Sequence, residues 1–322
     1  MKWNVYKSLR DSLARDMASV LPKKDRGRSG IADLAVRGAL TMVGNVVSTI
    51  DLEALQSETD WIDLQAPTYF PESPEMLEML WRAKMDVRTE DLELDKFPRA
   101  FSIAWPDCEI AGQRLKGCLI WWGSVEDRRV LIDKFDKRIF GKTGVTQYVP
   151  QAGDNSKSMH VYYMDNDDAS PTKEALFRVK VEGDRLTEWL SSKEEFEKRG
   201  REFGSTPLIF NLTQGESDRT FVMSRLAVRL MAYMRACPGK VKEGYPTGRG
   251  AREFNTRWTE PKPIFVGQPA GMLGGHGSPC AHWRTWHLRS YPIKRDGTKK
   301  AGLVFVDGTV VGLELDPATV SV

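Results

Sequence analysis

Apolar positions in the first ninety residues recur three or four places apart, for example at Leu9, Leu13 and Met17. This spacing is typical of a helix with one buried face. It predicts helices over 4–21 and 31–50. Ser73-Pro74 followed by Glu75 predicts the start of a third helix, because serine caps a helix and proline fits its first turn.

The middle of the chain carries short runs of β-branched and aromatic residues, bounded by Gly, Pro, Asp and Asn. Such runs predict strands. Adjacent Trp121 and Trp122 are expected to place one ring on each face of a sheet. His160 lies in an apolar run and is expected to be a hydrogen-bonded core residue. The predicted strands cover 100–105, 117–122, 145–149, 159–164 and 175–181.

Helical periodicity returns over 186–199, and segment 128–140 fits a helix or a strand equally well. A helix is expected to be capped by Ser217 and to end at Pro238-Gly239. Asp307-Gly308, within 303–315, predicts a β-hairpin with a tight turn. A short buried strand is also expected over 208–212.

These elements predict an α+β fold with a helical N-terminal region, a mixed central sheet with flanking helices, and a small basic β-rich C-terminal module. The expected divisions are 1–92, 93–238 and 239–322, where a Gly-, Pro- and Lys/Arg-rich loop precedes the β module. Neither an internal repeat nor a low-complexity tract interrupts this pattern.

Composition narrows the class of protein. The chain has 322 residues, 41% of them hydrophobic, with a net charge of +3 and four cysteines. These values exclude a histone-like polycation and a disulfide-dense scaffold. The opening residues lack the apolar core of a signal peptide, and no apolar run is long enough to span a membrane. We therefore expect a cytoplasmic protein with reduced cysteines, although its oligomeric state stays open.

Charge and histidine both concentrate near the C-terminus. Twelve basic and four acidic residues lie between 240 and 300. Three of the four histidines, His276, His282 and His287, lie in one twelve-residue stretch with interleaved Trp and Arg. If this stretch is extended, His287 and Arg289 share a face. A basic patch of this kind attracts phosphate-rich partners.

The run Ser278-Pro279, His282-Trp283-Arg284, His287 and Arg289 resembles the C-terminal motif of uncharacterised bacterial, phage and mobile-element proteins. The resemblance covers residues 274–312 alone. It implies a recurring module and a mobile-element origin, and no particular reaction. The positions that depart from the motif are Cys280, Ala281, Thr285 and Trp286.

Several interpretations of this stretch remain open. Trp283 and Trp286 are most simply packing residues. The leading functional hypothesis is nucleic-acid binding, RNA or DNA, with aromatic rings available to stack on bases. The cations expected to contact phosphates are Arg284, Arg289, Lys294, Arg295, Lys299 and Lys300.

The enzyme alternative is a metal-independent, toxin-like ribonuclease. His282 and His287 would act as general acid and base, and Arg284 or Arg289 would stabilise the phosphorane charge. A zinc site built from His276, Cys280, His282 and His287 matches no established ligand spacing, so no metal or cofactor is expected. The interaction alternative is a factor that binds a protein of a host system.

Overall fold

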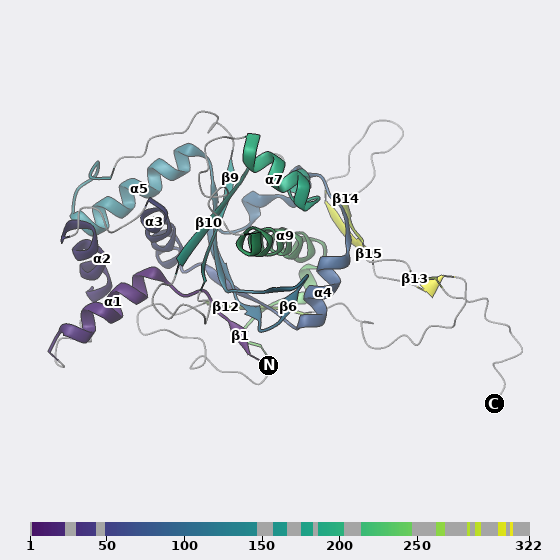
Figure 1. Cartoon of the computed structure of the whole chain (residues 1–322), viewed down its shortest axis with the longest axis horizontal. Helices are drawn as coiled ribbons and strands as arrows, with labels where there is room; N and C mark the ends of the chain where they lie inside the picture. The colour runs from purple at the N-terminus through teal and green to yellow at the C-terminus, as the bar shows by residue number, and fades with distance from the viewer. Residues whose placement is uncertain are drawn as a thin grey trace, which may run out of the picture.

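The computed structural model describes residues 2–22, 30–42, 49–146, 157–165, 175–182, 186–202, 214–246, 262–267, 282–283, 287–290, 302–306 and 310–311. It is an α+β protein, as the sequence pattern predicts. Figure 1 shows a curved sheet with helices on both faces, and one long helix, α9, enclosed between the sheet and a second set of elements.

The N-terminal helices are α1 (Leu9–Val20), α2 (Ile31–Met42) and α3 (Thr49–Asp63). The first begins later than expected, because Trp3–Asn4 forms a short strand, β1, paired with β5 (Trp105–Pro106). Ser8 then caps α1 by accepting a hydrogen bond from Asp11 N. The predicted helix over 31–50 ends at Met42 within the described residues, and α3 begins at Thr49.

Helix α4 (Pro74–Arg82) confirms the predicted start signal. The Ser73 side chain accepts a hydrogen bond from Met76 N, and Pro74 lies in the first turn. Leu77 and Leu80 are fully buried. The helix ends at Ala83, whose backbone is no longer helical, and the chain continues as β3 (Lys84–Asp86).

The central sheet has seven strands in the order β10-β9-β8-β4-β2-β12-β11. The pairs β4–β2 and β2–β12 are parallel and the others are antiparallel, so the sheet is mixed as predicted. Its strands come from all three divisions of the sequence. They are β2 (Pro67–Pro71), β4 (Ala100–Ile103), β8 (Cys118–Gly123), β9 (Ser158–Asp165), β10 (Ala175–Glu182), β11 (Val241–Glu243) and β12 (Lys262–Val266).

Trp121 and Trp122 confirm the expected split between the two sheet faces. Trp122 belongs to the large core that includes α9, whereas Trp121 packs with α3 and α5 (Val125–Phe140) on the opposite face. Segment 128–140, which fitted two structures, is therefore helical. A capping box between Ser124 and Asp127 opens α5, and Gly141, at φ 74°, ends it.

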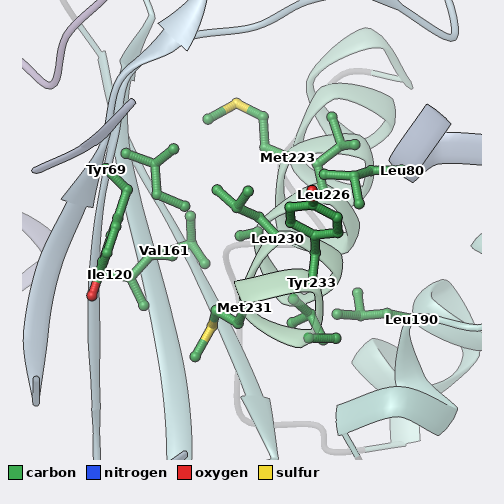
Figure 2. Packing of buried hydrophobic residues seen from close by; sticks show 14 of the residues in the cluster. Tyr69, Leu80, Ile120, Val161, Leu190, Met223, Leu226, Leu230, Met231 and Tyr233 are labelled. Atoms are coloured by element: carbon green, nitrogen blue, oxygen red, sulfur yellow. The ribbon is translucent and has the colours of Figure 1, made fainter. Parts of the chain in front are cut away.

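Helix α9 (Gln214–Ala236) is the centre of the large core. Figure 2 shows Tyr69, Ile120 and Val161 of the sheet facing α9 across the apolar layer. Ser217 lies inside this helix instead of capping it.

The helix predicted over 186–199 divides into α6 (Leu186–Trp189) and α7 (Lys193–Glu202).

Two expected strands near the C-terminus pair differently from the prediction. β15 (Leu303–Val306) pairs with β14 (His287–Ser290), and β16 (Val310–Val311) pairs with β13 (His282–Trp283). The predicted hairpin is wrong, because β15 and β16 do not pair with each other. Its turn residues lie outside the described chain. β15 pairs with β14 because both strands bury apolar side chains, Leu303 and Leu288, in the large core.

Val145 and Thr146 do not begin the strand expected over 145–149. Their backbone N–H groups donate to the buried carboxylate of Asp136, at 2.6 and 2.9 Å, which fixes a loop. The strand predicted over 208–212 lies outside the described residues. The remaining short elements are β6 (Glu109–Ile110), β7 (Gln113–Arg114), η1 (Thr89–Leu92), η2 (Leu94–Lys96) and η4 (Pro238–Lys240).

Candidate nucleic-acid interface

Strand β14 carries two of the expected site residues, His287 and Arg289. Side chains along it alternate: Leu288 and Ser290 are buried, whereas His287 is half-buried and Arg289 is exposed. Because successive side chains of a strand point to opposite faces, His287 and Arg289 share the outward face. The sequence predicts this sharing for an extended segment.

A strand from the N-terminal region completes this face. β14 lies between β15 and β3, and it runs parallel to β3. His287 is in register with Lys84, and Arg289 is in register with Asp86. Lys84 and Asp86 are exposed. We call Lys84, Asp86, His287 and Arg289 the outer face; it carries two permanent cations, one carboxylate and one imidazole.

The inner side of the same small sheet is fixed to the core. Arg88 N donates a hydrogen bond of 2.9 Å to Ser290 Oγ. Phe305 of β15 meets Tyr233 of α9 edge-on, with ring centroids 5.3 Å apart. In Figure 1, β14 and β15 lie side by side. The outer face therefore rests on a packed support.

The structure places the other candidate residues less completely. His282 lies in β13, which pairs with β16 in a different sheet from β14, and its side chain is not among those described. Within the described chain, only His287 and Arg289 of the expected set are brought together. The candidates that lie outside the described residues are Arg284, Lys294, Arg295, Lys299 and Lys300.

Sequence reasoning missed Lys84. It is the first residue of β3, just after the end of α4, and it joins the outer face only through the parallel pairing of β3 with β14. Local periodicity carries no signal for that pairing.

A second cationic feature lies at the junction of α4 and β3. Arg225 and Arg229, one turn apart on α9, place their guanidinium carbons 4.8 and 6.0 Å from the ring centroid of Trp81. Arg229 is 3% exposed and donates through Nη1 to the carbonyl oxygens of Leu80, at 2.6 Å, and Trp81. Burial lowers the pKa of Arg225. The pKa of Arg229 is lowered to about 9, mainly by burial and to a smaller extent by the nearby charge of Arg225. We call Arg225 and Arg229 the arginine pair.

A third polar group lies on the opposite sheet face, between α3, α5, β8 and β9. Arg128 donates to Ser57 Oγ at 3.0 Å and to the backbone oxygen of Glu53 at 3.1 Å. The Glu53 carboxylate lies 3.8 Å from Arg128 and 3.9 Å from His160 Nδ1. Arg128 also lies 5.0 Å from the ring centroid of Trp121. We call Glu53, Ser57, Arg128 and His160 the closed cluster.

His160 behaves as the sequence predicts. It is buried, its Nε2 lies 2.9 Å from Ser158 Oγ, and Tyr162 OH lies 3.4 Å from Nδ1. Within the described residues no group of three or more His, Cys, Asp or Glu is placed to hold a metal ion. None of the described helices is long and apolar enough to cross a membrane.

These features define a class of fold. A mixed seven-stranded sheet packs one face against a long helix that bears arginines, and a small three-stranded sheet is built partly from the C-terminal region. The chain matches no protein-family model, and neither the curated proteins nor the solved structures gave a match.

Proposed function

We propose that this protein is a cytoplasmic nucleic-acid-binding protein, and that the outer face, together with the basic segments next to it in sequence, contacts the phosphates. The observation that carries the proposal is the shared outward direction of His287 and Arg289, beside Lys84, on a strand whose other side is packed into the core. Cations on a fixed surface are the usual means of positioning a phosphate backbone.

Sequence and charge support this assignment. Arg284, Lys294, Arg295, Lys299 and Lys300 adjoin β14 along the chain, so they add to the same local excess of positive charge. Asp86 offsets one charge of the outer face, so the cations next to β14 in sequence supply most of the attraction for phosphates in this proposal. Cys108, Cys118 and Cys237 are free thiols, which fits a reducing compartment.

Binding is a better supported proposal than cleavage. A histidine acid–base pair must reach the same phosphodiester. His282 and His287 belong to strands of two different sheets, and nothing described joins their side chains at one site. We therefore assign no catalytic role to His282, His287 or Arg284.

The test is fluorescence anisotropy of labelled 20-nucleotide RNA and DNA at a series of salt concentrations, with the double variant Lys84→Ala/Arg289→Ala. The affinity is expected to fall about tenfold, and the slope of log K against log salt is expected to decrease by about one per lost phosphate contact. The matched control is Lys137→Ala/Lys142→Ala, which removes two exposed cations from and just after α5.

Equal behaviour of the two double variants would overturn the proposal, and so would a wild-type protein with no salt-dependent affinity for either strand. Gel analysis of the recovered RNA adds a second readout. Intact RNA agrees with binding; fragments that disappear with His282→Ala or His287→Ala would replace the proposal with the ribonuclease alternative.

A further inference from the structure

Two arginines of α9 hold positive charge inside the protein, and no opposite charge among the described residues lies beside them. Arg225 and Arg229 are four residues apart, so their side chains leave the helix on the same face. Like charges at this spacing repel each other. Among the described residues neither guanidinium has a carboxylate partner, and the Nε atoms of both are buried without a hydrogen bond.

The rest of α9 shows that the fold can supply a partner. Arg235, at the end of the same helix, forms an ion pair with Glu93. Arg229 instead donates hydrogen bonds through Nη1 to the last carbonyl groups of α4. These groups carry only the partial negative charge of a helix end. That contact fixes the side chain but leaves most of the charge of the pair uncompensated.

Trp81 holds the pair in a defined orientation. Arg225 lies over its ring and within 5.6 Å of the Phe221 ring centroid. A guanidinium stacked on an aromatic face keeps its N–H groups around the edge, where they can donate to a planar or tetrahedral oxyanion. Arg225 and Trp81 are only partly buried, so part of this stacked pair is open to solvent.

We propose that the arginine pair, held against Trp81, binds a phosphate monoester group. A phosphate monoester carries a charge of about −1.5 to −2 at neutral pH and three acceptor oxygens. It therefore matches two guanidinium groups, whereas a single carboxylate leaves one positive charge. This site goes beyond the proposed function and uses none of the outer-face residues, so either proposal can fail without the other.

The experiment follows binding of inorganic phosphate and of a mononucleotide to the full chain by isothermal titration calorimetry and by thermal unfolding. Sodium chloride keeps the ionic strength constant. Wild type is expected to gain a saturable rise in Tm, because a ligand that binds only the folded state stabilises it. Arg225→Gln is expected to weaken phosphate binding at least tenfold, and Arg225→Lys is expected to retain part of it.

The matched control is Arg82→Gln, which removes an exposed arginine of α4 that is already paired with Glu78. It should bind phosphate as wild type does. Affinity should also fall several-fold between pH 7.5 and 5.5, as the ligand takes up a proton. Circular dichroism shows whether each variant is folded. If Arg225→Gln does not fold, the pH dependence of phosphate binding by wild type and the affinity of Arg225→Lys test the proposal in its place.

Three results would overturn the proposal. One is the same rise in Tm for wild type and folded Arg225→Gln, which is a general salt effect. Another is stabilisation by succinate that equals or exceeds that by phosphate. The third is the absence of any phosphate binding by wild type at millimolar concentration.

Discussion

Arg128 and Arg229 have the same exposed fraction, 3%, yet their charges have different surroundings. Arg128 is surrounded by a serine hydroxyl, a backbone oxygen, the Glu53 carboxylate and the Trp121 ring. Arg229 has two carbonyl oxygens, the Trp81 ring at a longer distance, and a second arginine. The charge of Arg128 is balanced by the Glu53 carboxylate, whereas no carboxylate lies beside Arg229 in the part of the chain that the structure describes.

The difference separates structural charge from charge that is available to a ligand. A buried ion is tolerated when an opposite charge and hydrogen bonds compensate for its lost hydration. The closed cluster meets this condition and joins α3, α5 and β9. The arginine pair does not meet it with the described residues, and so an external anion has more to gain there.

Arg128→Met should produce the largest effect. It removes the donor to Ser57 Oγ and to the backbone oxygen of Glu53, and the cation beside the Glu53 carboxylate. Breaking a buried pair in this way costs about 3–5 kcal/mol. Urea unfolding of wild type and variant measures the difference. A loss below about 1 kcal/mol would show that the closed cluster is not a structural tie.

Arg229→Met should cost less, about 1–2 kcal/mol, in phosphate-free buffer. The variant loses hydrogen bonds to the end of α4, but it also removes a buried charge from beside Arg225. The same urea series makes the two values directly comparable. A loss as large as that of Arg128→Met would place Arg229 among the structurally balanced charges and contradict the comparison.

Asp127→Asn should give the smallest effect and tests a balanced charge near the surface. Burial opposes ionisation, but hydrogen bonds from Ser124 and the charges of Arg99 and Lys157 lower the pKa of Asp127. A lowered pKa in the folded state adds stability above the unfolded pKa, and this stability is lost as the pH falls through the folded pKa.

The unfolding free energies of wild type and Asp127→Asn should therefore differ by less than about 1 kcal/mol at pH 7 and converge in acid. Ser124→Ala is the companion variant, because it removes the other half of the capping box and should cost about 1 kcal/mol. A gap between wild type and Asp127→Asn that widens in acid would contradict the assigned direction of the pKa.

Local signals predicted the fold well where short-range chemistry decides it. Ser73 and Pro74 mark the start of α4, and the alternation of Trp121 and Trp122 assigns the two faces of the sheet. The outer face was predicted only in part. His287 and Arg289 share a face as expected, whereas Lys84 joins them through a pairing between distant segments.

The arginine pair was not predicted at all. In sequence, Arg225 and Arg229 look like ordinary polar positions of a surface helix, and such residues are usually exposed. Only the enclosure of α9 between the sheet, α4 and α7 buries Arg229 and half-buries Arg225. Burial of this kind depends on how distant elements pack, which neither periodicity nor composition encodes.

The position of β12 has a consequence for the order of folding during synthesis. β12 pairs with β2 on one side and β11 on the other, although β2 ends at Pro71 and β12 begins at Lys262. During synthesis this edge of β2 stays unpaired until residues 262–266 have left the ribosome. Pairings of such sequence separation are slow to form, and so the emerging N-terminal portion is a natural client for chaperones that shield strand edges.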